Sequence, residues 1–201
     1  MISNVKEQAS KNAYIQKLRE SLIARELDSA DCLILAHQDD VLAKRLAPIS
    51  KYHRTLAIHE SQAEWHFDES ELAAAIGWAL REGGIRSLYI CGHTFGFSKN
   101  PLLSDDRFSE YSDLEKNKDE IADRLWMLGR LMGNQKRLQN AKNHFADQVH
   151  QILELPVVQR AIQRGNLKIH ALFFLAQAGT FMSFDPNSGE FSPLIPSDDR
   201  L

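Results

Sequence analysis

Short apolar runs alternate with segments of helical periodicity along this chain, and no other sequence feature restricts the fold as strongly. Residues 32–36 and 87–91 are short and largely apolar, which is typical of strands buried on both faces of a sheet. Between them, residues 72–80 repeat apolar side chains at helical spacing, and Gly83 and Gly84 end that helix. Strands that alternate with helices predict an α/β fold with a mostly parallel sheet.

The remaining segments extend this pattern into a single domain, predicted over residues 1–201. Its first part, residues 1–25, is predicted to be an amino-terminal helical arm, because residues 5–24 have an amphipathic helical pattern. We expect four parallel strands and a fifth, antiparallel edge strand, flanked by helices. The further strands are predicted at residues 55–58, 167–174 and 179–185. The further helices are predicted at residues 42–46, 114–155 and 157–164. Pro48 is expected to stop the first of these helices, and Gly129 or Gly133 to break the second.

Composition excludes several classes of function. A net charge of −3 gives no general electrostatic reason to bind nucleic acid or an anionic membrane surface, so we expect neither partner. The apolar runs are too short to span a bilayer, and the amino terminus has no signal-peptide pattern, so we predict a cytoplasmic protein. The two cysteines, Cys32 and Cys91, lie in strand-like runs and are expected to be buried thiols.

The third predicted strand ends at Gly92 and His93, which places an imidazole at the carboxyl end of a strand. Sites of α/β proteins form at this position. Residues 94–97 supply no second imidazole or thiolate at short range. A site is therefore expected at this strand end, but the residues next to His93 do not supply a complete set of metal ligands.

Two further segments, together with Gly92 and His93, resemble the β-class carbonic anhydrases. Residues 146–170 contain a helix that ends before a proline, a short helix and then Gly-Asn-Leu-Lys-Ile-His, and residues 179–185 follow as Gly-Thr-Phe-Met-Ser-Phe-Asp. The order of these segments is similar to that of the family, and Gly92-His93 resembles the family's Gly-His-Ser motif. The resemblance implies a four-stranded parallel sheet with an antiparallel fifth strand, in a homodimer or higher homo-oligomer.

The chain departs from the family at the positions that the resemblance assigns to zinc. Family members hold zinc through a cysteine in a Cys-x-Asp-x-Arg loop and through the histidine and cysteine of His-x-x-Cys. The corresponding residues here are His37 and Gly96 for the two cysteines and Val41 for the arginine. Only Asp39 and His93 keep the family's identity.

Two interpretations of these residues remain open. Hydration of carbon dioxide needs a metal-bound water whose pKa falls to about 7, on a cation held by three protein ligands. His37, Asp39 and His93 are all competent zinc ligands and form one alternative set. In the other interpretation, His93 is a hydrogen-bonded structural residue and His37 lies in a solvated turn.

We therefore predict a carbonic-anhydrase-like protein with a degenerate zinc site, a catalytically inactive scaffold or small-ligand-binding homologue. His93 and His37 are its vestigial metal residues, and Asp39 is the catalytic residue that has lost its arginine partner. No cofactor is expected. The alternative is an active, zinc-dependent carbonate dehydratase or a related lyase or hydrolase that uses His37, Asp39 and His93. The expected small-molecule partner is a small anion, or carbon dioxide and bicarbonate.

Overall fold

A computed structural model describes residues 12–37, 40–60, 69–94, 120–176 and 178–194. Its centre is a six-stranded sheet with the strand order β2-β1-β3-β4-β5-β6. The first four strands in this order are parallel, and β5 and β6 are antiparallel to their neighbours. The strands are β1 (Cys32–His37), β2 (Thr55–Glu60), β3 (Ser87–His93), β4 (Lys168–Leu175), β5 (Thr180–Asp185) and β6 (Glu190–Pro193).

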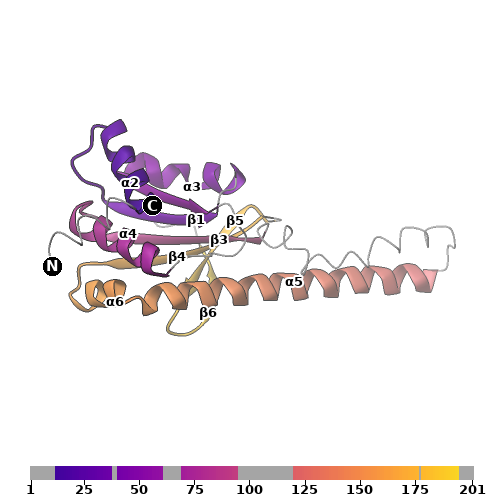
Figure 1. The fold of residues 1–201 in the computed structure, drawn as a ribbon. Helices are drawn as coiled ribbons and strands as arrows, with labels where there is room; N and C mark the ends of the chain where they lie inside the picture. Colours follow the sequence, from indigo (N-terminus) through magenta and orange to yellow (C-terminus); the bar gives the residue numbers. More distant parts are fainter. Residues whose placement is uncertain (1–11, 38–39, 61–68, 95–119, 177, 195–201) are drawn as a thin grey trace.

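Helices cover both faces of the sheet. They are α2 (Ala13–Ala24), α3 (Asp40–Tyr52), α4 (Glu69–Arg81), α5 (Glu120–Glu154) and α6 (Pro156–Gln163). Figure 1 shows that α5 runs beneath the sheet and continues well beyond its end. None of the helices in the described part of the chain is long and apolar enough to cross a membrane.

The predicted α/β fold with four parallel strands is confirmed, and the structure adds one strand. β6 follows β5 through a tight turn in which the amide of Gly189 donates to the carbonyl of Asp185 at 2.8 Å. The Asp185 carboxylate also accepts from the amide of Asn187 at 2.9 Å, and Gly189 has a φ of +73°. The antiparallel fifth strand therefore lies inside the sheet, and β6 forms the edge.

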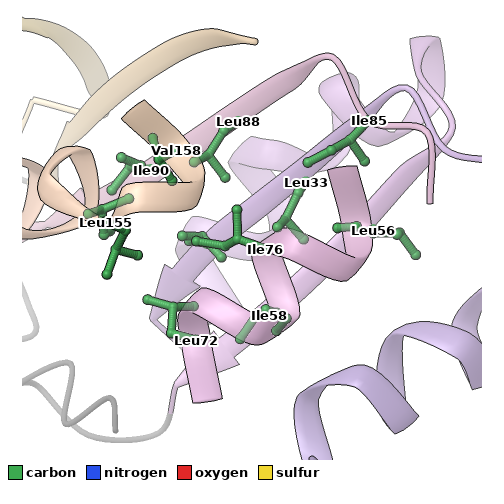
Figure 2. Packing of buried hydrophobic residues seen from close by; sticks show 14 of the residues in the cluster. Leu33, Leu56, Ile58, Leu72, Ile76, Ile85, Leu88, Ile90, Leu155 and Val158 are labelled. Atoms are coloured by element: carbon green, nitrogen blue, oxygen red, sulfur yellow. The ribbon is translucent and has the colours of Figure 1, made fainter. Parts of the chain in front are cut away.

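Alternating residues of the strands build two hydrophobic clusters, one on each face. The larger cluster contains Leu33 and Leu88 and is covered by α2, α4, α5 and α6. Figure 2 shows how residues of α4, such as Ile76, pack against strand residues of this cluster. The smaller cluster contains Ile34 and Cys91 and is covered by Leu42 and Leu46 of α3. Burial on both faces explains why the strands are almost uniformly apolar.

The amino-terminal helix α2 packs against its own chain. The Asn12 side chain accepts hydrogen bonds from the amides of Tyr14 and Ile15, and it donates to the carbonyl of Glu71 in α4 at 2.9 Å. Side chains of α2 such as Leu18 are buried in the larger cluster. The residues before Asn12 lie outside the described part, and the division into one domain with an arm over residues 1–25 stays a prediction.

Two predicted helix ends are wrong. α3 does not stop at Pro48 but continues to Tyr52. Leu42 and Leu46 hold α3 on the sheet, and this packing offsets the hydrogen bond that a proline removes. α5 is continuous through Gly129 and Gly133, because a glycine inside a helix costs only about 1 kcal/mol relative to alanine and does not by itself end it.

Candidate functional site

The carboxyl ends of β1 and β3 bring two of the predicted site residues to the same end of the sheet. β1 ends at His37 and β3 ends at His93, and the two strands are adjacent and parallel. His37 is placed by its backbone, opposite Glu60 of β2. Asp39 and Gly96 lie outside the described residues, and Val41 is near the start of α3.

His93 is deeply buried, with 4% of its surface exposed. Its neighbour across the sheet is Phe174 of β4, whose ring lies 5.0 Å from the ring of Phe181. The Arg45 guanidinium of α3 lies above the Phe174 ring at 6.0 Å. His93 therefore lies next to Phe174 in the sheet, and Phe174 in turn contacts Phe181 of β5.

Cys91 precedes His93 by two residues and belongs to the smaller cluster with Phe174. Residues two apart on a strand point to the same face. Burial raises the pKa of the Cys91 thiol well above its ordinary value, so at neutral pH the sulfur is a protonated thiol inside the core and not a thiolate ligand.

Gly92 is fitted to an aromatic ring from a distant helix. A Cβ atom at this position would lie 2.9 Å from Cε2 of Phe145 in α5 and closer still to its Cδ2. The Phe145 ring also contacts Phe173 and Phe184, with centroid distances of 5.4 and 6.2 Å. The residue before His93 must therefore be small, because α5 packs directly on the backbone of β3.

Thr94 ties the end of β3 to the end of β4. Its hydroxyl oxygen accepts a hydrogen bond from the amide of Ala176 at 3.1 Å. Together with the Gly92 contact, this bond fixes the backbone on both sides of His93.

The described residues do not bring a complete ligand set together. Among them, no three histidine, cysteine, aspartate or glutamate side chains form a group that could hold a metal ion. Sequence reasoning also missed the charged residues just before the strands, Asp31 before β1, Arg54 before β2 and Arg86 before β3. Their only signal in the sequence is a charge directly before each apolar run.

Comparisons with known proteins agree with this architecture. The family described as carbonic anhydrase matches residues 52–181, more than half of the chain. No curated protein matches the chain by sequence.

Several solved structures share the fold. The β-carbonic anhydrase CcaA has a TM-score of 0.57 at 18% identity, covering 98% of this chain and 93% of that one. The β-carbonic anhydrase CafA of Aspergillus fumigatus has a TM-score of 0.55 at 18% identity, covering 92% and 89%. A tetrameric β-carbonic anhydrase from Sordaria macrospora has a TM-score of 0.52 at 14% identity, covering 90% and 93%. The chain belongs to the carbonic anhydrase family, and its fold is that of the β-class structures.

Proposed function

We propose that this protein is a carbonic-anhydrase-fold scaffold or small-ligand-binding protein whose zinc site is degenerate and which does not hydrate carbon dioxide at a useful rate. The observation that carries this proposal is the setting of His93. It is a buried imidazole at the end of β3, bordered by Phe174, at the place where the family's zinc histidine is expected.

The donor set supports the proposal. In the alignment that the resemblance implies, the three zinc positions hold His37, His93 and Gly96. Glycine has no side chain to coordinate a metal, and Val41 leaves Asp39 without the arginine that would orient it. The family's two thiolates and one imidazole thus become two imidazoles and no thiolate, so these residues do not fit the usual zinc site.

The packing around His93 supports a structural role for this residue in the proposal. Among the described residues, no buried side-chain nitrogen or oxygen lacks a hydrogen-bond partner. His93 also has an interaction within the protein. A buried imidazole that is satisfied in this way can be kept for folding alone, without any metal.

The test combines zinc analysis of the purified protein with stopped-flow measurement of carbon dioxide hydration. We expect substoichiometric zinc and a hydration rate equal to that of buffer. His93→Ala is compared with the matched control His150→Ala, whose side chain is exposed on α5. Stoichiometric zinc, with an activity that is lost in H93A and kept in H150A, would refute the proposal.

A second candidate is an active enzyme that uses His37, Asp39 and His93 as a substituted zinc site. It is favoured by the strand topology, because the strands that end at His37 and His93 are adjacent and parallel. A crystal structure grown with zinc would support it if all three side chains lay within about 2.0 to 2.2 Å of one cation. Zinc binding that survives both H37A and H93A would exclude it.

A third possibility is that the protein binds bicarbonate as its ligand. If the protein binds bicarbonate near His93, saturating bicarbonate must raise the melting temperature, because binding to the folded state stabilises it by mass action. An unchanged melting temperature excludes bicarbonate as the ligand.

We propose a cytoplasmic homodimer or higher homo-oligomer without nucleic acid or membrane partners, and one fold relative is a tetramer. Sedimentation analysis would test the assembly.

A further inference from the structure

An open hollow lies at the opposite end of the sheet from His93, beside the first residues of the parallel strands. Its volume is about 450 Å³, within the range of small-molecule sites. Residues that line it include Asp31, His53, Arg54, Arg86 and Tyr89. Since β3 rises by about 3.3 Å per residue, its two ends are about 20 Å apart, and the hollow is separate from the expected zinc site.

The strand register explains why charged residues meet here. Thr55 and Ser87 both pair with Cys32, so the residues just before β2, β1 and β3 are neighbours across the sheet. These preceding residues are Arg54, Asp31 and Arg86. A line of charged side chains therefore crosses the starts of three parallel strands.

Asp31 and Arg54 neutralise each other. The Arg54 guanidinium donates to the two carboxylate oxygens of Asp31 at 2.7 and 3.3 Å, and the Arg54 amide donates at 3.0 Å. These hydrogen bonds from Arg54 lower the pKa of the Asp31 carboxyl. The Asp31 carboxylate is thus already occupied by one arginine.

Arg86 differs from Arg54 in this respect. It is exposed, and within the described part of the chain no acidic side chain forms an ion pair with its guanidinium. His53 also lines the hollow, and Lys168, the first residue of β4, pairs with Ser87 across the sheet. Among the residues that line the hollow, the two arginines outnumber the single carboxylate of Asp31, so the hollow favours an anion.

Tyr89, which lines the hollow, is stacked on a second ring. The ring of Tyr89 lies against the ring of His170, with centroids 4.5 Å apart and planes 14° apart. Burial, together with the positive charge of Lys168, lowers the pKa of His170, which favours the neutral form of this imidazole at pH 7. Tyr89 thus gives the hollow an uncharged aromatic side chain.

We propose that this hollow binds a small organic phosphate, with the Arg86 guanidinium holding the phosphate group and the remaining volume holding the organic part. A guanidinium that forms no ion pair within the described residues can form two parallel hydrogen bonds to phosphate oxygens. The hollow is larger than a free phosphate needs, and its walls are mainly polar, which favours a hydroxyl-bearing compound such as a sugar phosphate.

Isothermal titration calorimetry tests the site with ribose 5-phosphate as the probe and ribose as its uncharged counterpart. We expect the phosphate ester to bind in the micromolar to millimolar range and ribose not to bind. Arg86→Gln should weaken binding by about tenfold or more, because it removes charge-assisted hydrogen bonds. Arg86→Lys should keep part of the affinity, since it keeps the charge but not the planar group.

Arg164→Gln is the matched control. Arg164 is an exposed arginine at the end of α6 and does not line the hollow. R164Q should bind ribose 5-phosphate as the unmodified protein does, and circular dichroism melting should show that both variants fold. Absence of binding to the unmodified protein, equal binding of ribose, or equal weakening by R86Q and R164Q would each overturn the proposal.

Discussion

Replacing Gly92 with alanine should destabilise the protein through a single steric contact. The added Cβ would lie 2.9 Å from Cε2 and 3.1 Å from Cγ of Phe145. Carbon atoms in good contact are about 3.5 to 4.0 Å apart, so the overlap is about 0.6 Å or more. Gly92 does not have a positive φ, so backbone strain makes no contribution.

The ring of Phe145 has little room to move away, because it packs among Phe173, Phe184 and Phe191. Overpacking in such a core costs about 1 to 3 kcal/mol, and we expect about 2 to 3 kcal/mol here. For a chain of this size that corresponds to a fall in melting temperature of roughly 4 to 12 °C. Urea denaturation followed by circular dichroism measures the free energy of unfolding directly.

A double-mutant cycle separates this contact from other causes. Phe145→Ala alone should cost about 3 to 5 kcal/mol, and adding G92A should then cost little, because the ring that clashed is gone. Gly133→Ala in α5 is the control, since a Cβ there meets nothing within 4 Å and alanine favours a helix. The reasoning fails if G92A changes stability by less than about 0.5 kcal/mol, or if the two substitutions are additive.

Three further predictions concern stability and reactivity. Asn12→Ala should lower the free energy of unfolding by about 1 to 2 kcal/mol, because it removes the cap of α2 and the bond to Glu71; an unchanged urea midpoint would contradict this. Asp31→Asn should destabilise the protein above about pH 4, because the folded-state pKa of Asp31 is lowered by Arg54. This difference should disappear as the pH falls through that lowered pKa, and urea titrations of both proteins across acidic pH measure it. Both cysteines are buried, so Ellman's reagent should react with them only after unfolding; fast reaction of one thiol per native chain would show that this burial is wrong.

The parallel strands could be predicted because their apolar pattern reflects burial on both faces. Ile34 and Ile90, for example, are almost fully buried although they face opposite clusters. β6 was missed because it is only four residues long, ends at Pro193 and has mostly exposed side chains. In a strand of this kind, local sequence carries little signal, and pairing with β5 determines its structure.

The position of His93 at the end of a strand could be predicted from the sequence, but its packing could not. A histidine at the end of a buried strand indicates the carboxyl end of the sheet, where His93 lies. The need for glycine at position 92 depends on Phe145, which is distant in the sequence and reaches β3 only through the packing of α5. The pairing of Asp31 with Arg54 likewise depends on the register between β1 and β2. Contacts between residues that are far apart in the sequence cannot be predicted from local sequence patterns.

The strand order also has a consequence for how the chain folds. β1, β2 and β3 are joined by short crossovers, whereas β3 and β4 are neighbours in the sheet but are separated in sequence by the segment that contains α5 and α6. Closing a longer loop costs more entropy, so pairing of β3 with β4 should be a late step. During synthesis, β3 is then the open edge of a three-stranded intermediate, and Gly92 lies uncovered until Phe145 has been made. Substitutions in β4 should therefore change the unfolding rate more than the folding rate, which stopped-flow kinetics can measure.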